Sequence, residues 1–110
     1  MTDKIVVLTT CGSPDEAERV ARHLVELRLA ACVQITPGVR SFYHWKGGIA
    51  DDAEIQLVIK STRFLFAALC AELRKMHSYE VPEIIAVPVV DGAASYLEWM
   101  DRELLRARSV

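Results

Sequence analysis

The residues with the most evident chemistry lie in one short stretch, residues 77–83, which contains one imidazole, one phenol and two carboxylates. A helical pattern ends just before it at Met76, and an apolar, strand-like run over residues 84–87 follows it. Pro82 biases the residue before it toward extended backbone, so the connection has few conformations. Polar groups on a loop between rigid elements are typical of binding sites. A structural interpretation stays open, in which His77 meets the last carbonyls of its own helix.

The other reactive groups are three thiols, those of Cys11, Cys32 and Cys70. Their number is odd, they are widely spaced, and they form neither a CxxC pair nor a zinc-finger spacing. Cys32 and Cys70 lie at apolar positions, so we expect both in the core. Free thiols of this kind favour a reducing compartment, and we expect a cytoplasmic protein.

Length and composition limit the possible functions. The chain has 110 residues, enough for one domain over residues 1–110 and too few for two. Its net charge of −2 provides no basic field for nucleic acid, and no apolar run approaches the roughly 20 residues of a membrane span. The hydrophobic fraction of 52% is high for a small protein. Association of several chains would bury the excess.

The first half of the chain alternates between strand and helix patterns. Residues 4–10 are a continuous apolar run rich in β-branched side chains, which predicts a strand buried on both faces. A helix is expected from Ser13 to about Arg28, because Ser13 can cap it and Pro14 suits its first turn. Glu16 stands three residues after Ser13, which predicts a capping box.

The middle of the chain predicts two further strands. Residues 29–45 alternate between faces but are interrupted at 37–38 by Pro-Gly, which is typical of an edge strand or a bulge. Residues 46–48 are expected to turn the chain. Residues 54–60 show a clear period of two, with Ile55, Leu57 and Ile59 on one face, and no Pro or Gly, so this strand can be central.

The last part predicts a helix, a strand and a final helix. Ser61 or Thr62 is expected to cap the helix that ends at Met76. The strand over residues 83–90 is interrupted by Pro88 and is therefore expected at a sheet edge. A turn at 91–92 leads into the final helix, and residues 106–110 are expected to fray.

The resulting order is β-α-β-β-α-β with an additional C-terminal helix. Two right-handed βαβ crossovers give an antiparallel sheet in the order 4-1-3-2. This order places the second and fourth strands at the edges, where the two prolines independently require them. The sequence therefore predicts a ferredoxin-like α+β sandwich.

Five segments, in this order along the chain, resemble the CutA family of divalent-cation tolerance proteins. They are residues 29–33 (LAACV), 41–47 (SFYHWKG), 59–61 (IKS), 77–84 (HSYEVPEI) and 96–99 (YLEW). The resemblance implies a ferredoxin-like fold, a tight homotrimer and a link to copper and other divalent metals. We therefore expect a protein of divalent-metal tolerance or response, which binds a metal ion in the cytoplasm.

The resemblance also implies a copper site. In some bacterial members, a Cys after the first strand and His residues before a Tyr-x-x-Pro segment bind copper, and the matching positions here are Cys11 and His77. Met76 stands where some members have a second His, and a thioether can still ligate Cu(I). The predicted topology brings the two residues to the same sheet edge, because the first and fourth strands are antiparallel neighbours. A loop thiol and a helix-capping His remain the structural alternative.

A second group of residues suits a different function. Tyr43, Trp45, Lys60, Tyr79 and Glu83 can line a cleft for a small anionic or zwitterionic ligand, as in a PII-like module that binds a metabolite between subunits. The same residues also suit a subunit interface, and a trimeric scaffold without a ligand is a third possibility. The usual hydrolase, nucleotide and zinc-protease motifs are absent from the sequence, so we expect no enzyme.

Overall fold

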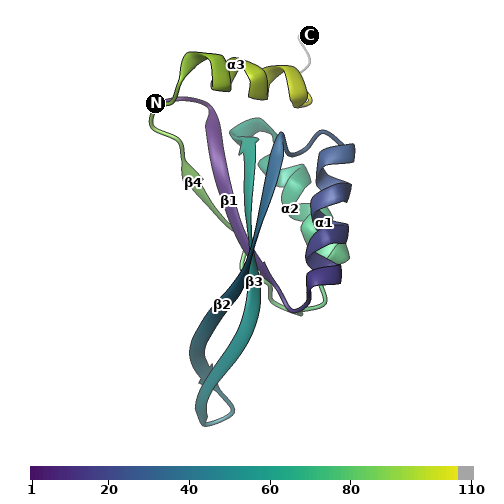
Figure 1. The fold of residues 1–110 in the computed structure, drawn as a ribbon, viewed down its shortest axis with the longest axis vertical. Coiled ribbons are helices and arrows are strands. Elements are labelled where there is room, and N and C mark those ends of the chain that lie inside the picture. The colour runs from purple at the N-terminus through teal and green to yellow at the C-terminus, as the bar shows by residue number, and fades with distance from the viewer. Residues whose placement is uncertain (107–110) are drawn as a thin grey trace.

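The computed structural model describes residues 1–106, which fold as a four-stranded antiparallel sheet with three helices (Figure 1). The strand order is β2-β3-β1-β4, which is the predicted order counted from the other edge. The elements are β1 (Lys4–Cys11), α1 (Pro14–Glu26), β2 (Cys32–Trp45), β3 (Gly48–Thr62), α2 (Phe66–Met76), β4 (Ile85–Pro88) and α3 (Ala94–Glu103). The predicted ferredoxin-like α+β fold is confirmed. The expected fraying concerns residues 107–110, which lie outside the described part.

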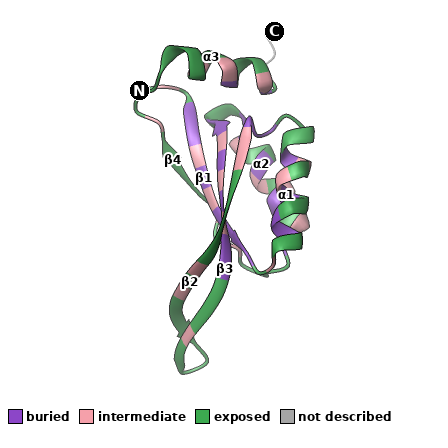
Figure 2. Cartoon of the chain, viewed as in Figure 1, coloured by how far each residue is buried: buried purple, intermediate pink, exposed green. Residues whose placement is uncertain are grey.

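The core lies between the sheet and the helices α1 and α2, which cover one of its faces (Figure 2). The central strands β1 and β3 supply its inner rows, since Val7 pairs with Ile59 and Thr9 with Leu57, and all four are fully buried. The helices contribute their buried apolar residues to the same core, Val20 and Leu24 from α1 and Leu69 and Leu73 from α2. The period-two pattern of Ile55, Leu57 and Ile59 therefore identified the buried face of β3 correctly. The prediction that the first strand is buried on both faces was wrong, since Val6 and Leu8 on its second face are only half-buried.

The hairpin of β2 and β3 is longer than predicted. β3 begins at Gly48 rather than near residue 54, and the turn contains only Lys46 and Gly47, both with positive φ (47° and 80°). Such a two-residue turn matches the twist of the strands, so the ladder continues to the tip. The predicted break at Pro37 is confirmed as a register shift between Thr36 and Val39. The hairpin projects from the body and gives the molecule extents of 51 × 26 × 22 Å (Figure 1).

Two other predictions of local structure were wrong. Neither Ser61 nor Thr62 caps the second helix, which begins instead with a 3₁₀ turn over Arg63–Leu65. β3 continues through residue 62, so the Ser61 hydroxyl is buried and donates to the Leu29 carbonyl at 2.7 Å. β4 is also shorter than residues 83–90, since only Ile85–Pro88 pair with β1. None of the helices in residues 1–106 has the length and apolar character required to cross a bilayer.

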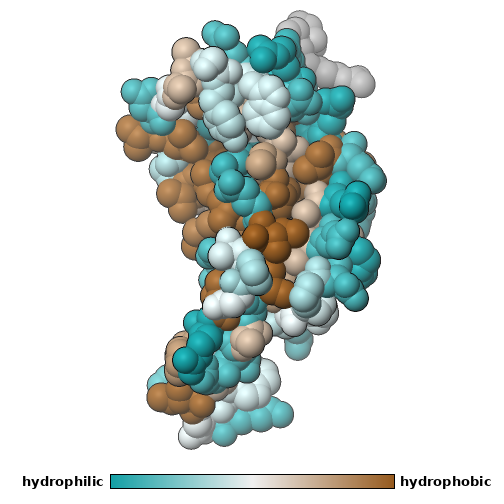
Figure 3. Space-filling view, viewed as in Figure 1, coloured by the Kyte–Doolittle hydropathy of each residue, from teal (hydrophilic) through white to brown (hydrophobic). Residues whose placement is uncertain are grey.

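The second face of the sheet is largely uncovered. α3 closes only one end of it, where Lys4 bonds to Asp101 and the Leu105 amide donates to the Arg28 carbonyl. Beyond α3, cross-strand neighbours form an apolar surface that we call the open sheet face. It consists of Val6, Leu8, Val58, Ile85 and Val87. Figure 3 shows hydrophobic residues gathered over β1 and β4, whereas the α1 side of the view is hydrophilic.

Candidate metal centre

Cys11 is the last residue of β1 and its side chain faces the core. It lies opposite Ile55 of β3 and is completely buried. Because β1 and β4 are antiparallel, the end of β1 lies beside the segment that leads from α2 into β4. His77 begins that segment, immediately after the last residue of α2. The expected proximity of Cys11 and His77 is therefore found.

The hydrogen bonds of His77 determine its tautomer. Its imidazole is fully buried, and Nε2 donates to the Thr10 carbonyl at 2.5 Å. Nδ1 accepts from the Tyr79 amide at 3.0 Å. A carbonyl can only accept and an amide can only donate, so the ring is neutral with its proton on Nε2. The imidazole does not contact the carbonyls of its own helix, which excludes the side-chain capping interpretation.

Glu16 completes the cluster, and sequence reasoning missed it as a candidate ligand. The Glu16 amide donates to the Ser13 hydroxyl oxygen at 3.2 Å, so Ser13 caps the helix as predicted, but the carboxylate does not return to Ser13. It accepts instead from the Ser78 amide (3.2 Å) and hydroxyl (2.8 Å), and one oxygen lies 3.6 Å from His77 Nδ1. The reciprocal half of the predicted capping box is therefore wrong. The only sequence signal was its place in the first helical turn, close after Cys11.

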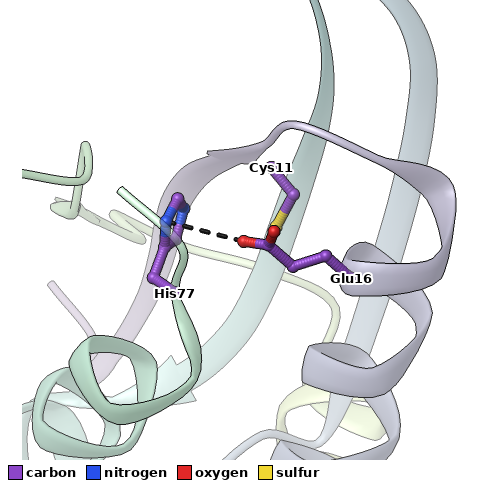
Figure 4. Close-up of side chains that lie close together, drawn as sticks. All are labelled: Cys11, Glu16 and His77. Carbon is purple, nitrogen blue, oxygen red and sulfur yellow. Dashed lines mark ion pairs between the residues drawn. The ribbon is translucent and has the colours of Figure 1, made fainter. Parts of the chain in front are cut away.

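The three side chains converge on one point from three different elements. Figure 4 shows the Cys11 thiol beside the Glu16 carboxylate, with the His77 ring facing that carboxylate. One sulfur, one oxygen and one nitrogen donor atom lie within 4.8 Å of one another. Thiolate, imidazole and carboxylate are all ligands of zinc, and the first two also suit copper. The donor set therefore fits a transition-metal ion.

The electrostatic field in the cluster favours a cation. The pKa of the Cys11 thiol is raised to about 11, first by burial and then by the nearby charges of Glu16 and Glu54. Both glutamates are buried, and among residues 1–106 neither forms an ion pair with a Lys or Arg. Two buried carboxylates without a cationic partner make the site electron-rich. A metal ion would supply the missing positive charge.

Tyr79 packs beside this cluster. Its ring lies 4.7 Å from the His77 ring, and its hydroxyl donates to Glu54 at 2.9 Å. Burial, followed by this hydrogen bond, raises the pKa of Tyr79. Gly12 makes the close approach possible, because a Cβ there would lie only 3.2 Å from the Tyr79 oxygen. The Tyr79 side chain is therefore held against His77 and Gly12 while remaining partly exposed to solvent.

The five predicted cleft residues do not form one cleft within the chain. Tyr43 and Trp45 lie on the hairpin with ring centroids 6.5 Å apart, and the Tyr43 hydroxyl donates to Asp52. Lys60 lies at the opposite end of β3, with its ammonium 5.8 Å from the Tyr96 ring centroid. Tyr79 packs against His77 and bonds to Glu54, and Glu83 is exposed before β4. A cleft between subunits stays a prediction.

The remaining sulfur groups lie apart from this cluster. Cys32 at the start of β2 and Cys70 in α2 are half-buried, so the expectation that both lie in the core was only partly right. All three cysteines are free thiols. Met76 is half-buried and packs against the core at the end of α2.

Comparison with known proteins agrees with this architecture. A family model described as CutA1 divalent ion tolerance protein matches residues 5–103. The chain belongs to the CutA1 family. It is 44% identical over 95 residues to the divalent-cation tolerance protein CutA of Thermus thermophilus, an alignment that covers 86% of this chain and 92% of the relative. It is 45% identical over 91 residues to human Protein CutA, covering 83% of this chain and 51% of the human one.

Solved CutA1 structures share the fold. CutA from Xylella fastidiosa superposes with a TM-score of 0.91 at 41% identity, covering 94% of this chain and 99% of the other. CutA1 from Oryza sativa superposes with a TM-score of 0.92 at 38% identity, covering 94% and 95%. CutA1 proteins are named from more than one compartment, since a rice relative is called chloroplastic and an Archaeoglobus fulgidus structure periplasmic. The family name denotes tolerance of divalent cations and describes no catalytic activity.

Proposed function

We propose that this CutA1 chain is a homotrimeric, cytoplasmic protein of divalent-metal tolerance that binds a transition-metal ion, such as copper, through Cys11 and His77. The observation that carries the proposal is the convergence of a thiol, an imidazole and a carboxylate within 4.8 Å. The residues of the site act by binding, and residues 1–110 act as one domain. Because the strongest donors are a thiol and an imidazole, the site favours copper over magnesium or calcium.

The binding chemistry of each residue follows from its contacts. The Cys11 thiol loses its proton and binds as thiolate, which a positive charge in this acidic pocket makes favourable. The Nε2 proton of His77 is held by the Thr10 carbonyl, so Nδ1, which lies 3.6 Å from Glu16 Oε1, is the nitrogen that carries no proton. Metal-binding histidines are oriented by such a second hydrogen bond. When Nδ1 acts as a ligand, the Tyr79 amide must release it.

The exposed apolar surface supports association into a trimer. Ile85 and Val87 on the open sheet face remain 50% and 45% exposed, and Phe42, Trp45 and Ile49 on the hairpin are 60% or more exposed. Large exposed apolar surfaces typically mark protein interfaces, and the number three is what the family resemblance implies. The metabolite-binding alternative has no support within one chain, because its five residues lie at separate places. The free thiols support a reducing, cytoplasmic compartment.

Calorimetric titration with Cu(I) under anaerobic, reducing conditions tests the site. We expect Cys11→Ser and His77→Ala each to weaken copper binding at least tenfold, because each removes one of the two strongest ligands. Cys32→Ser is the matched control, since it makes the same change at a thiol outside the cluster and should retain the wild-type affinity. Unchanged affinity in both Cys11→Ser and His77→Ala would exclude the site.

A further inference from the structure

We propose that Glu16 is a third ligand of this centre, and that it makes the centre select a borderline divalent cation, such as Zn²⁺ or Co²⁺, over Cu(I). The inference rests on the proposed metal site at Cys11 and His77 and defines the class of ion that it takes. Neither the family resemblance nor the spacing of residues points to Glu16. Its role follows from where the fold places its carboxylate.

The hydrogen bonds of Glu16 leave one of its oxygens available. Oε2 is held by the Ser78 hydroxyl at 2.8 Å, which fixes the orientation of the carboxylate. Within residues 1–106, Oε1 accepts only the longer bond from the Ser78 amide, at 3.2 Å, and it is the oxygen that faces His77 Nδ1 at 3.6 Å. Ligating carboxylates are commonly oriented by a hydrogen bond to one oxygen in this way. Oε1 is therefore the oxygen that can turn toward a cation.

The spacing of the donor atoms is close to that of a metal site. Neighbouring ligands of a tetrahedral zinc ion are roughly 3.5 Å apart, which follows from bond lengths of about 2.0–2.3 Å. The three donor atoms here lie within 4.8 Å of one another, and Oε1 and Nδ1 are already at 3.6 Å. Small side-chain movements are enough to close the remaining gaps. The open fourth position would be available to water.

Charge balance decides between a divalent and a monovalent ion. A thiolate from Cys11, a carboxylate from Glu16 and the neutral imidazole of His77 carry two negative charges together. A dication neutralises them, whereas Cu(I) leaves one negative charge uncompensated in a pocket where all three side chains are buried. Uncompensated buried charge is strongly unfavourable. Glu54 adds a further buried carboxylate nearby, which increases the preference for the dication.

The types of donor atom, like the charge, favour a divalent ion over Cu(I). Carboxylate oxygen is a hard donor that zinc accepts readily, whereas Cu(I) is satisfied by soft sulfur and imidazole donors. Removing the Glu16 charge should therefore weaken Zn²⁺ binding more than Cu(I) binding. If Glu16 served only to hold Ser78, its substitution would weaken the binding of both ions equally, because it would act through the position of the loop.

The test compares Glu16→Gln with Glu18→Gln in competition titrations against chelators for Zn²⁺ and Cu(I), performed anaerobically on the full chain. Glu18 is the matched control, because it lies on the same helix, is exposed and pairs with the exposed Arg22. We expect Glu16→Gln to weaken Zn²⁺ binding 10- to 100-fold and Cu(I) binding less than threefold. Glu18→Gln should change neither affinity. The absorption of bound Co²⁺ provides a second measurement, since losing a ligand alters its d–d bands.

If Glu16→Gln weakens the binding of Zn²⁺ and Cu(I) equally, or changes neither affinity, Glu16 is not a selective ligand, and Cys11 and His77 remain the site. Metal affinities that are insensitive to Cys11→Ser and His77→Ala would instead refute the proposed function itself, so the two failures are distinguishable. Thermal melting verifies that Glu16→Gln folds. If it does not, Glu16→Asp retains the charge but withdraws the oxygen by one methylene group. Glu16→Asp should weaken Zn²⁺ binding more than Cu(I) binding, and an unchanged ratio of the two affinities would contradict the proposal.

Discussion

β1 begins and ends with a buried ionisable side chain, and the surroundings of the two differ. At its start, the Lys4 ammonium lies 2.7 Å from Asp101 and 2.6 Å from Asp3. Burial alone would lower the pKa of Lys4, but the hydrogen bonds and charges of Asp101 and Asp3 outweigh it and hold the pKa above 10.5. At the other end, the thiol of Cys11 has two carboxylates nearby and its pKa is raised to about 11. At one end of the strand the carboxylates are paired with a cation, whereas at the other, within residues 1–106, no Lys or Arg pairs with Glu16 or Glu54.

Asp101→Asn tests the ion-paired end. We expect it to lower the free energy of unfolding by about 1 kcal/mol at pH 7, because Lys4 loses one charged partner but keeps Asp3. The folded-state pKa of Lys4 is raised, so the contribution is fully present below the unfolded value of about 10.5 and is lost as the pH rises through the folded value. Denaturant titrations of both proteins between pH 7 and 11 should therefore converge at high pH. Glu98→Gln on the same helix is the control, and an equal loss there would contradict a specific role for Asp101.

At the scale of elements, β3 combines two functions along its length. Its later half supplies Leu57 and Ile59 to the core, where both are fully buried. Its earlier half, from Gly48, forms the projecting hairpin with β2. Lys60 alternates to the open side of the same strand and lies near Tyr96. Substitutions only three residues apart should therefore have very different consequences.

Leu57→Ala should lower the free energy of unfolding by about 2–5 kcal/mol, because it leaves a cavity in the core. Lys60→Ala should change it by less than about 1 kcal/mol, since its half-buried side chain makes no ion pair within the described residues. Chemical denaturation of both variants measures the difference. A Lys60→Ala protein that failed to fold would show that Lys60 serves the structure instead of a ligand.

The whole molecule has more apolar surface than one chain can cover. Two helices cover one face of the sheet, while α3 covers only an end of the other (Figure 1). The open sheet face and the hairpin are therefore left exposed on an elongated body of 51 × 26 × 22 Å. A second and third copy of the chain would bury both surfaces and cover the edge strands β2 and β4.

Light scattering after gel filtration at low micromolar concentration should give the mass of a trimer. We expect Val87→Lys to weaken the assembly, because it places a charge on the open sheet face. Val25→Lys is a matched control on the outer surface of α1, since Val25 is 44% exposed and Val87 is 45% exposed. A wild-type protein that elutes as a stable monomer would refute the trimer. Equal loss of mass in both variants would show that the open sheet face is not the interface.

The sequence alone determined the order of the elements, the sheet order and the proximity of Cys11 to His77. These follow from local rules, since side-chain periodicity identifies the buried face of each element. Pro37 and Pro88 excluded two strands from the centre of the sheet, because proline has no N–H to donate to a neighbouring strand. Once the topology was known, the end of β1 had to lie beside the segment before β4.

Only the tertiary structure decided which side chains satisfy one another. Glu16 bonds to Ser78, 62 positions away, and Ser61 to Leu29, 32 positions away, although both have good local partners in the sequence. The dispersal of Tyr43, Lys60 and Tyr79 likewise depends on the length of the hairpin. Local rules describe which hydrogen bonds a residue can make with its chain neighbours. A buried polar group instead takes the partner that packing places beside it, and that partner comes from distant parts of the chain.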